Sequence, residues 1–190
     1  MRMRWIGAVA LPVAAGCARP AAAPSAAALP PLGRPAVIVP AGSTPLDIGE
    51  GTVRLLAEGA GTANAWAALE RTEPPGTRTG LHRHNRMDEA FYVVRGTLTV
   101  FVDGRLHSLP AGSFVLIPRG TPHAQGNLTA DTLTMVSFFS PAGWEQSARA
   151  RAALHREHPA GTAEFGRRIG PLLTGFDLEP LGPSPLPAPR

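Results

Sequence analysis

Two histidines one residue apart, followed closely by two carboxylates, are the residues of this sequence best suited to chemistry. The stretch GLHRHNRMDEAFYVVRG contains His82, His84, Asp88 and Glu89. Side chains two residues apart in a β-strand point to the same face, so His82 and His84 are expected to lie side by side. A carboxylate on the next strand can return towards these imidazoles after a short turn. This arrangement is typical of a metal site, although a charged turn between two strands contains the same residue types.

The alternation of the second strand distinguishes the two carboxylates. Glu89 shares a strand face with the apolar residues Phe91 and Val93, whereas Asp88 falls on the opposite face. The apolar face of a strand is the one that turns towards a core. We therefore expect Glu89 to point inward and Asp88 to point to solvent.

A third histidine with suitable surroundings, His123, lies in the stretch GSFVLIPRGTPHAQGN. Pro118 and Gly120 indicate a turn, and Pro122 fixes the backbone directly before the histidine. Gln125 lies on the same strand face two residues later. His123 is therefore the candidate for a fourth, rigidly held ligand.

The elements that must position these side chains are short segments rich in Val, Thr, Phe and Leu, separated by Gly, Pro and Asp. This pattern predicts strands at residues 52–57, 63–72, 89–95, 97–103, 113–118 and 131–140. Arg95-Gly96 and Asp103-Gly104 indicate hairpin turns between them. No helical period occurs between residues 50 and 140, so the pattern favours an antiparallel sandwich or barrel over an α/β sheet.

The pattern changes after Pro141. The stretch PAGWEQSARARAALHREH has apolar residues at helical spacing among charges, which predicts one amphipathic helix. One further short helical turn is expected before a Pro-rich tail.

The other polar and aromatic candidates favour structural roles. Three histidines, which have no ligand spacing to the first three, are expected to be solvated: His107, His155 and His158. The arginines from Arg149 to Arg168 predict a solvated face. Four aromatic residues are candidates for a pocket lining, but aromatic side chains in a small barrel more often belong to the core: Trp66, Phe91, Phe101 and Phe139.

The first residues, MRMRWIGAVALPVAAGCARP, have a basic tip, an apolar stretch and small residues, which is the layout of a signal peptide. The apolar stretch is too short for a permanent transmembrane helix. The sequence Ala14-Ala15-Gly16-Cys17 resembles the bacterial lipobox, which implies cleavage before Cys17 and a lipid on that cysteine. Ala14 stands where the lipobox usually has Leu or Val, so ordinary signal-peptide cleavage stays open.

These features define the expected organisation of the chain. It consists of a signal peptide (1–16), an Ala/Pro-rich tether (17–46), a barrel (47–140), and a C-terminal helical extension with a Pro-rich tail (141–190). Cys17 is the only cysteine, so no disulfide forms within one chain. We expect export to the cell envelope, with lipid attachment to a membrane through Cys17 or, failing that, a periplasmic or secreted protein.

The charge distribution argues against a nucleic-acid partner. All 18 basic residues are arginines, and the formal net charge is only +4, with no basic run. A small-molecule substrate or ligand is the expected partner. The sequence excludes neither a monomer nor a homodimer.

Two stretches resemble the two motifs of the cupin family. The first motif, G-x5-H-x-H-x4-E-x6-G, is met by Gly76, His82, His84, Glu89 and Gly96. The second motif, G-x5-P-x-G-x2-H-x3-N, is met by Gly112, Pro118, Gly120, His123 and Asn127. Fifteen residues separate the motifs, as in compact members of the family, and no position departs from either pattern.

The resemblance, which covers residues 50 to 140, implies an all-β fold, the double-stranded β-helix or cupin jelly-roll barrel. It also implies one divalent transition metal ion held by His82, His84, Glu89 and His123. Three neutral imidazoles and one carboxylate suit Fe, Mn, Ni, Cu or Zn and leave coordination positions open for other ligands.

The tail from Ser140 to Pro183 resembles that of small bacterial cupins grouped with flavonol (quercetin) dioxygenases. This similarity implies a dioxygenase that acts on a small aromatic or enolic substrate, flavonol-like or catechol-like, with Glu89 as the catalytic base. Two other functions stay open. One is an envelope protein that binds a small ligand or metal without chemistry, and the other is a metal-dependent isomerase or lyase.

Overall fold

The computed structural model describes residues 36–188. The expected signal peptide, Cys17 and most of the expected tether lie outside the described residues. The described end of the tether, residues 36–45, contains no helix or strand. None of the helices in the described part of the chain is long and apolar enough to cross a membrane.

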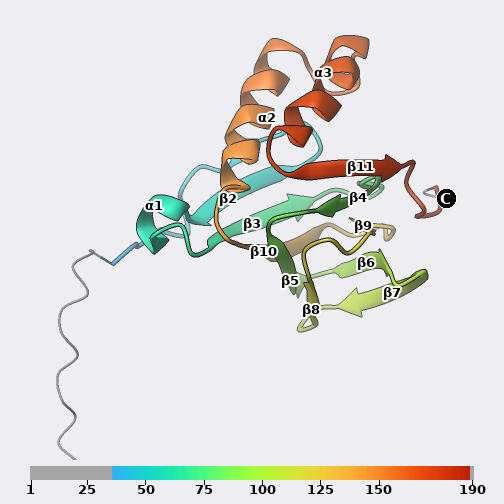
Figure 1. Ribbon diagram of the computed structural model, residues 1–190, viewed down its shortest axis with the longest axis horizontal. Helices are drawn as coiled ribbons and strands as arrows, with labels where there is room; N and C mark the ends of the chain where they lie inside the picture. The colour runs from blue at the N-terminus through green and yellow to red at the C-terminus, as the bar shows by residue number, and fades with distance from the viewer. Residues whose placement is uncertain (1–35, 189–190) are drawn as a thin grey trace, which may run out of the picture. The chain divides into compact units, whose positions relative to one another are not determined.

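Two facing antiparallel sheets form the folded part (Figure 1). The larger sheet has the order β1-β2-β3-β10-β5-β8. Its strands are β1 (Leu46–Asp47), β2 (Thr52–Ala57), β3 (Ala67–Glu73), β5 (Asp88–Arg95), β8 (Phe114–Ile117) and β10 (Leu133–Ser140). The smaller sheet has the order β11-β4-β9-β6-β7. Its strands are β4 (Leu81–His84), β6 (Thr97–Val102), β7 (Arg105–Pro110), β9 (His123–Gly126) and β11 (Leu178–Gly182).

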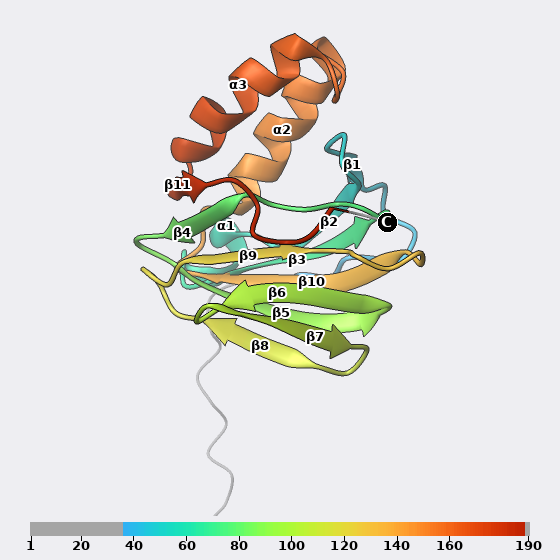
Figure 2. The ribbon, with the colours of Figure 1, turned by 90° about the vertical axis from the view of Figure 1, so that its right-hand side faces the viewer.

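The chain passes back and forth between the two sheets from β3 to β10, so that neighbours in sequence often face each other across the core (Figure 2). This winding is that of a double-stranded β-helix, and the predicted fold class is confirmed.

The interior between the sheets is built by strand alternation. In β10, every second residue from Leu133 to Phe139 is buried, including Met135 and Ser137, while the residues that alternate with them are partly or fully exposed. Phe91 and Val93 of β5 are buried beside them. Burial of each such apolar side chain stabilises the fold by about 1.5–3 kcal/mol. Since the period of two is fixed along β5, the same inward face carries Glu89.

Two helices follow the barrel strands and pack against each other: α2 (Glu145–Glu157) and α3 (Ala163–Thr174). α2 contacts β1 and β3 of the larger sheet, and α3 contacts β11 of the smaller sheet. Ala148 and Ala152 of α2 join a buried cluster with Leu69. The helix pair therefore spans both sheets on one side of the barrel (Figure 2).

The structure differs from the predicted elements at three places. The predicted strand 63–72 begins only at Ala67, because a helical turn, α1 (Gly59–Thr62), is followed by Ala63 and Asn64 in the left-handed region. α3 has 12 residues where a short helical turn was expected. β11 was not predicted.

β11 returns the C-terminal extension to the barrel. It pairs with β4, with Leu178 opposite His84 and Pro180 opposite His82. Because β11 is the edge strand of the smaller sheet, Pro180, which has no N–H to donate, is tolerated there. The C-terminal extension thus contacts the strand that carries two candidate ligands.

Candidate metal centre

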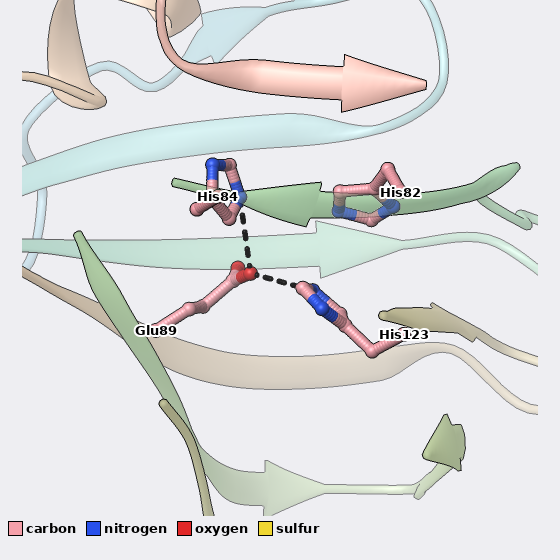
Figure 3. Close-up of side chains that lie close together, drawn as sticks. All are labelled: His82, His84, Glu89 and His123. Carbon is pink, nitrogen blue, oxygen red and sulfur yellow. Dashed lines mark hydrogen bonds and ion pairs between the residues drawn. The ribbon is translucent and has the colours of Figure 1, made fainter. Parts of the chain in front are cut away.

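The four candidate ligands come together from both sheets (Figure 3). His82 and His84 lie on β4 and His123 on the adjacent β9, where His82 and His123 are directly paired. Glu89 faces them from β5 of the larger sheet. All four side chains are buried, and one ligand atom of each lies within 4.8 Å of the others. The strand alternation expected from the sequence therefore places all four at one point inside the barrel.

Glu89 is at the centre of the cluster. Its Oε2 atom lies 3.3 Å from Nε2 of His84 and 3.1 Å from Nε2 of His123. The ring centroid of His82 lies 4.3 Å from that of His123. The Nε2 atoms of His84 and His123 are thus aimed at the carboxylate.

The opposite nitrogen of each imidazole is held by a backbone carbonyl oxygen. The Nδ1 atom of His82 lies 2.9 Å from the carbonyl oxygen of Gly80, and that of His123 lies 3.0 Å from the carbonyl oxygen of Thr121. The third such pair joins Nδ1 of His84 to the carbonyl oxygen of Asp177 at 3.0 Å. A carbonyl oxygen only accepts, so each Nδ1 carries a proton, and Nε2 is the nitrogen whose lone pair becomes available to a metal ion once it is deprotonated. This is the usual arrangement of metal-binding histidines.

The donor set fits a divalent ion. The Nε2 atom of His84 is buried and has no hydrogen-bond partner among the described residues. A buried nitrogen lone pair without a partner is costly, and a cation between it and Glu89 would satisfy both groups. The four buried residues can hold one metal ion, and the donor types do not select one transition metal over another.

The pKa shifts within the cluster also indicate that a positive charge is favoured beside Glu89. Burial, with a smaller contribution from the neighbouring His123, lowers the pKa of His82 to about 4. Burial also opposes the charge on Glu89, but the hydrogen bond with His123 and the close approach of His84 outweigh it and lower the pKa of that carboxyl. Burial opposes the charge on His84 too, but the neighbouring Glu89 outweighs it and raises the pKa of His84. The carboxylate therefore stays ionised and retains a proton nearby, in the place that a metal cation would take.

Two motif residues hold the ligand strands in place. The backbone N–H of Gly120 donates to the carbonyl oxygen of His84 at 2.6 Å, with Gly120 in the left-handed region at a φ of 80°. The side-chain amide of Asn127 is fully buried and donates to the carbonyl oxygens of Glu73 and Asp131. These contacts fix the turn before His123 and the end of its strand.

Asp88 points away from the cluster, as predicted. It forms an ion pair with Arg119, with an Nη2–Oδ2 distance of 2.9 Å. The hydrogen bond from Arg119 lowers the pKa of Asp88 to about 2. Asp88 therefore stays an outward carboxylate that does not compete with Glu89.

A cavity of about 250 Å³ reaches the cluster and exposes three of its members, His82, His84 and Glu89. Gln125 lines it, as its strand face predicts. The C-terminal extension supplies a large part of the wall, including Trp144, Ile169, Leu173, Leu178 and Arg151. None of the four aromatic residues named from the sequence lines this cavity; Phe91 and Phe139 are core residues.

Two expectations about the extension are wrong. Arg151 does not belong to a solvated face, because its side chain is only 12% exposed and lies in the cavity wall. His155 is half-buried, since its Nδ1 accepts a hydrogen bond from the backbone N–H of Ala160 and its ring packs against Phe165. Helical spacing alone did not reveal that this face of α2 covers the barrel.

Asp177 is the functional residue that sequence reasoning missed most completely. Its carboxylate accepts hydrogen bonds from the backbone N–H and the Nε of Arg86, and its carbonyl oxygen orients His84. Asp177 and His84 are 93 positions apart in the sequence. No local pattern marks Asp177, so only the folded chain shows its role.

We expect Asp177→Gly to weaken metal binding about tenfold, since lost outer contacts of metal-binding histidines usually have effects of this size. Glycine tolerates the φ of 71° at this position but lacks the carboxylate that anchors it. Competition with a chelator measures the affinity. Glu179→Gln is the matched control on the same segment, because the contacts of this carboxylate, with Arg83 and Asn85, lie at the surface and involve none of the candidate ligands. Equal affinities in the two variants would contradict a role of Asp177 in orienting His84.

Comparisons with known proteins agree with the motifs. Residues 70–139 match the family model described as "Cupin domain". No curated protein matches the chain. Among solved structures, an RmlC-like cupin from Shewanella frigidimarina is 25% identical, with a TM-score of 0.48, and the match covers 55% of this chain and 89% of that chain.

Two further solved structures are similar at a lower identity. KdgF from Halomonas sp. is 24% identical, with a TM-score of 0.46, and the match covers 51% of this chain and 85% of that chain. A predicted oxalate decarboxylase from Thermotoga maritima is 21% identical, also with a TM-score of 0.46, and the match covers 48% of this chain and 80% of that chain. Similarity at this level says nothing of the activity of this chain.

The segment that matches the family model includes the candidate metal centre. The matched segment, residues 70–139, contains both motifs and all four candidate ligands. The double-stranded β-helix formed by the strands of this segment agrees with the match to the Cupin domain model.

Proposed function

We propose that this chain is a metal-dependent dioxygenase that acts on a small aromatic or enolic substrate. The observation that supports it best is that three of the four donor side chains line a cavity. A substrate in this cavity would lie directly against the ion. A purely structural metal site is, by contrast, normally closed to small molecules.

The described residues can provide the protein's part of this chemistry. A divalent ion bound here would supply Lewis acidity and open coordination positions. His82, His84 and His123 are oriented by carbonyl oxygens before any substrate binds. Glu89 is ionised and lines the cavity, so it is placed to accept the proton of a substrate hydroxyl.

The cavity size restricts the substrate. At about 250 Å³, it is smaller than the sites of drug-sized ligands, which are usually about 300–1,000 Å³. A single-ring or short enolic compound therefore fits better than a flavonol. Within the expected class, this favours catechol-like over flavonol-like substrates.

Oxygen uptake tests the proposal. Samples loaded separately with iron, manganese, nickel or copper are incubated aerobically with catechols, flavonols and 1,3-diketones. We expect oxygen consumption above that of the metal-free protein with at least one pair of metal and substrate. If no pair consumes oxygen, the dioxygenase is excluded. Saturable binding without product would then favour the binding protein, and product without oxygen uptake would favour an isomerase or lyase.

We also propose that the chain is exported and carries a lipid on Cys17, which lies outside the described residues. The basic tip, the apolar stretch and the small residues before the sole cysteine support this proposal. Intact mass measurement of the native protein should give a chain that begins at Cys17 with added acyl groups. A mass that starts at Met1, found in membrane-free cytosol, would contradict export.

A further inference from the structure

The wall of the cavity contains several cationic side chains. Three arginines line it, Arg71, Arg78 and Arg151, and the acidic residues of the described wall are Glu50 and the candidate ligand Glu89. A concave surface with several guanidinium groups concentrates negative charge from solvent. The cavity therefore favours an anion beside the metal centre.

Arg71 is buried on the inner face of the barrel. It follows Leu69 in the inward alternation of β3 and is only 9% exposed. Its Nη2 atom lies 2.5 Å from Oε1 of Glu73. Burial raises the pKa of Glu73, and Arg71 only partly opposes this shift.

Arg151 reaches the same cavity from α2. Its Nη2 atom pairs with Oε2 of Glu50 at 2.8 Å, but the side chain of Glu50 is 53% exposed to solvent. The Nε atom of Arg151 is buried and has no hydrogen-bond partner among the described residues. Burial lowers the pKa of Arg151, and the charge of Arg71 contributes to this shift. The two guanidinium groups both line the cavity and repel each other, so an anion bound there would reduce this repulsion.

Arg78 adds a third guanidinium group to the cavity wall. Its Nη1 atom donates to the carbonyl oxygen of Leu186 at 3.3 Å, and the described residues contain no carboxylate paired with it. Trp144 and Leu173 also line the cavity, and the ring of Trp144 packs edge-on against His84, with 4.7 Å between the ring centroids. The cavity lining thus combines candidate metal ligands, apolar side chains and guanidinium groups.

We propose that the substrate of this site is a small carboxylic acid, held by Arg71 and Arg151 through its carboxylate, with an enolic or catechol oxygen directed to the metal ligands. Guanidinium groups bind carboxylates with charge-assisted hydrogen bonds and defined geometry. This inference rests on the proposed function, because it names the substrate class of the same site. Arg71 and Arg151 are then the residues that determine specificity for an acid over a neutral analogue.

A matched pair of probes tests the inference. Zinc-loaded protein, which does not turn over by redox chemistry, is titrated calorimetrically with 3,4-dihydroxybenzoate and with 3,4-dihydroxybenzamide. The catechol end is the same in both probes, and only the charge of the other end differs. We expect the acid to bind at least about tenfold more tightly than the amide.

Variants of the two arginines test whether these side chains cause the preference for the acid over the amide. Arg151→Gln should lower the preference for the acid about tenfold, and so should Arg71→Gln/Glu73→Gln, which removes both charges and leaves no unpaired buried carboxylate. Arg149→Gln is the control, because Arg149 lies on the same helix but is half-exposed and paired with Glu58. Zinc content and thermal unfolding are measured for each variant, so that a folding defect is recognised.

The outcomes separate this inference from the proposed function. Equal binding of both probes, no binding of the acid, or a preference that survives both variants would overturn the carboxylate site. The same titrations with metal-free protein test the arginines independently of the ion. An arginine-dependent preference without oxygen uptake would reject the dioxygenase and keep the anion site. Oxygen uptake with neutral catechols, without any preference for the acid, would reject the anion site and keep the dioxygenase.

Discussion

The variant His82→Ala/His123→Ala is expected to lose its divalent ion, from about one ion per chain to less than a tenth of that. The two imidazoles come from adjacent strands and are directly paired, so their removal leaves only His84 and Glu89. Loss of a single outer contact of a metal-binding histidine already costs about 10- to 100-fold in affinity, and loss of two direct ligands should cost more. Elemental analysis of purified protein measures the metal content.

The matched control for this prediction is Asp88→Asn. Asp88 is next to Glu89 in sequence but lies on the outer face of β5, paired with Arg119. Exposed ion pairs contribute at most about 1 kcal/mol, so this variant should keep both its fold and its metal. Unchanged metal content in the double histidine variant, or a loss in Asp88→Asn similar to that in the double variant, would show that the ion binds elsewhere.

Strand alternation explains why the ligands could be predicted from the sequence. His82 and His84 are two residues apart on one strand, and Glu89 shares its face with Phe91, which is fully buried. A period of two leaves one choice of inward face once the apolar side is known. His123 follows a turn whose Pro and Gly residues are recognisable. All four positions are therefore determined by local patterns.

The C-terminal part could not be predicted in the same way. Gly166, Gly170 and Pro171 are unfavourable inside a helix, yet all three lie within α3, which packs against α2 and β11. Pro180 and Gly182 indicate a loop, yet they belong to β11 because an edge strand needs only one partner. Tertiary contacts outweigh local preference in both elements.

The cavity wall shows the same limit for single side chains. Arg71 lies within a segment correctly predicted to contain a strand, but a charged residue on an inward face breaks the apolar alternation and gives no signal of its orientation. Arg151 and Trp144 reach the site only because α2 packs over the barrel. The side chains of the cavity wall were thus harder to predict than those of the candidate metal centre, since they come from distant segments without a common spacing.

Glu89→Gln is expected to reduce turnover about 10²- to 10⁴-fold, the usual contribution of a general base, while metal content falls much less. Glutamine keeps the length of the side chain and an oxygen that can ligate a metal ion, but its amide does not accept a substrate proton. The carboxylate of Glu89 is ionised, lines the cavity, and lies near His84 and His123. It is therefore placed both to ligate and to act as a base. Oxygen uptake and elemental analysis of the same samples separate the two roles.

Glu70→Gln is the control for this prediction, because Glu70 lies on the outer side of β3 and pairs with Arg54 away from the cavity. Removal of that partly exposed pair should leave turnover and metal content unchanged. If turnover and metal content fall in parallel in Glu89→Gln, Glu89 acts only as a ligand. If turnover falls alone, the carboxylate has a chemical role that an amide oxygen at the same position cannot replace. Because the hydrogen bond with His123 and the neighbouring His84 already hold the pKa of this carboxyl low in the metal-free protein, the base should stay ionised throughout the neutral pH range.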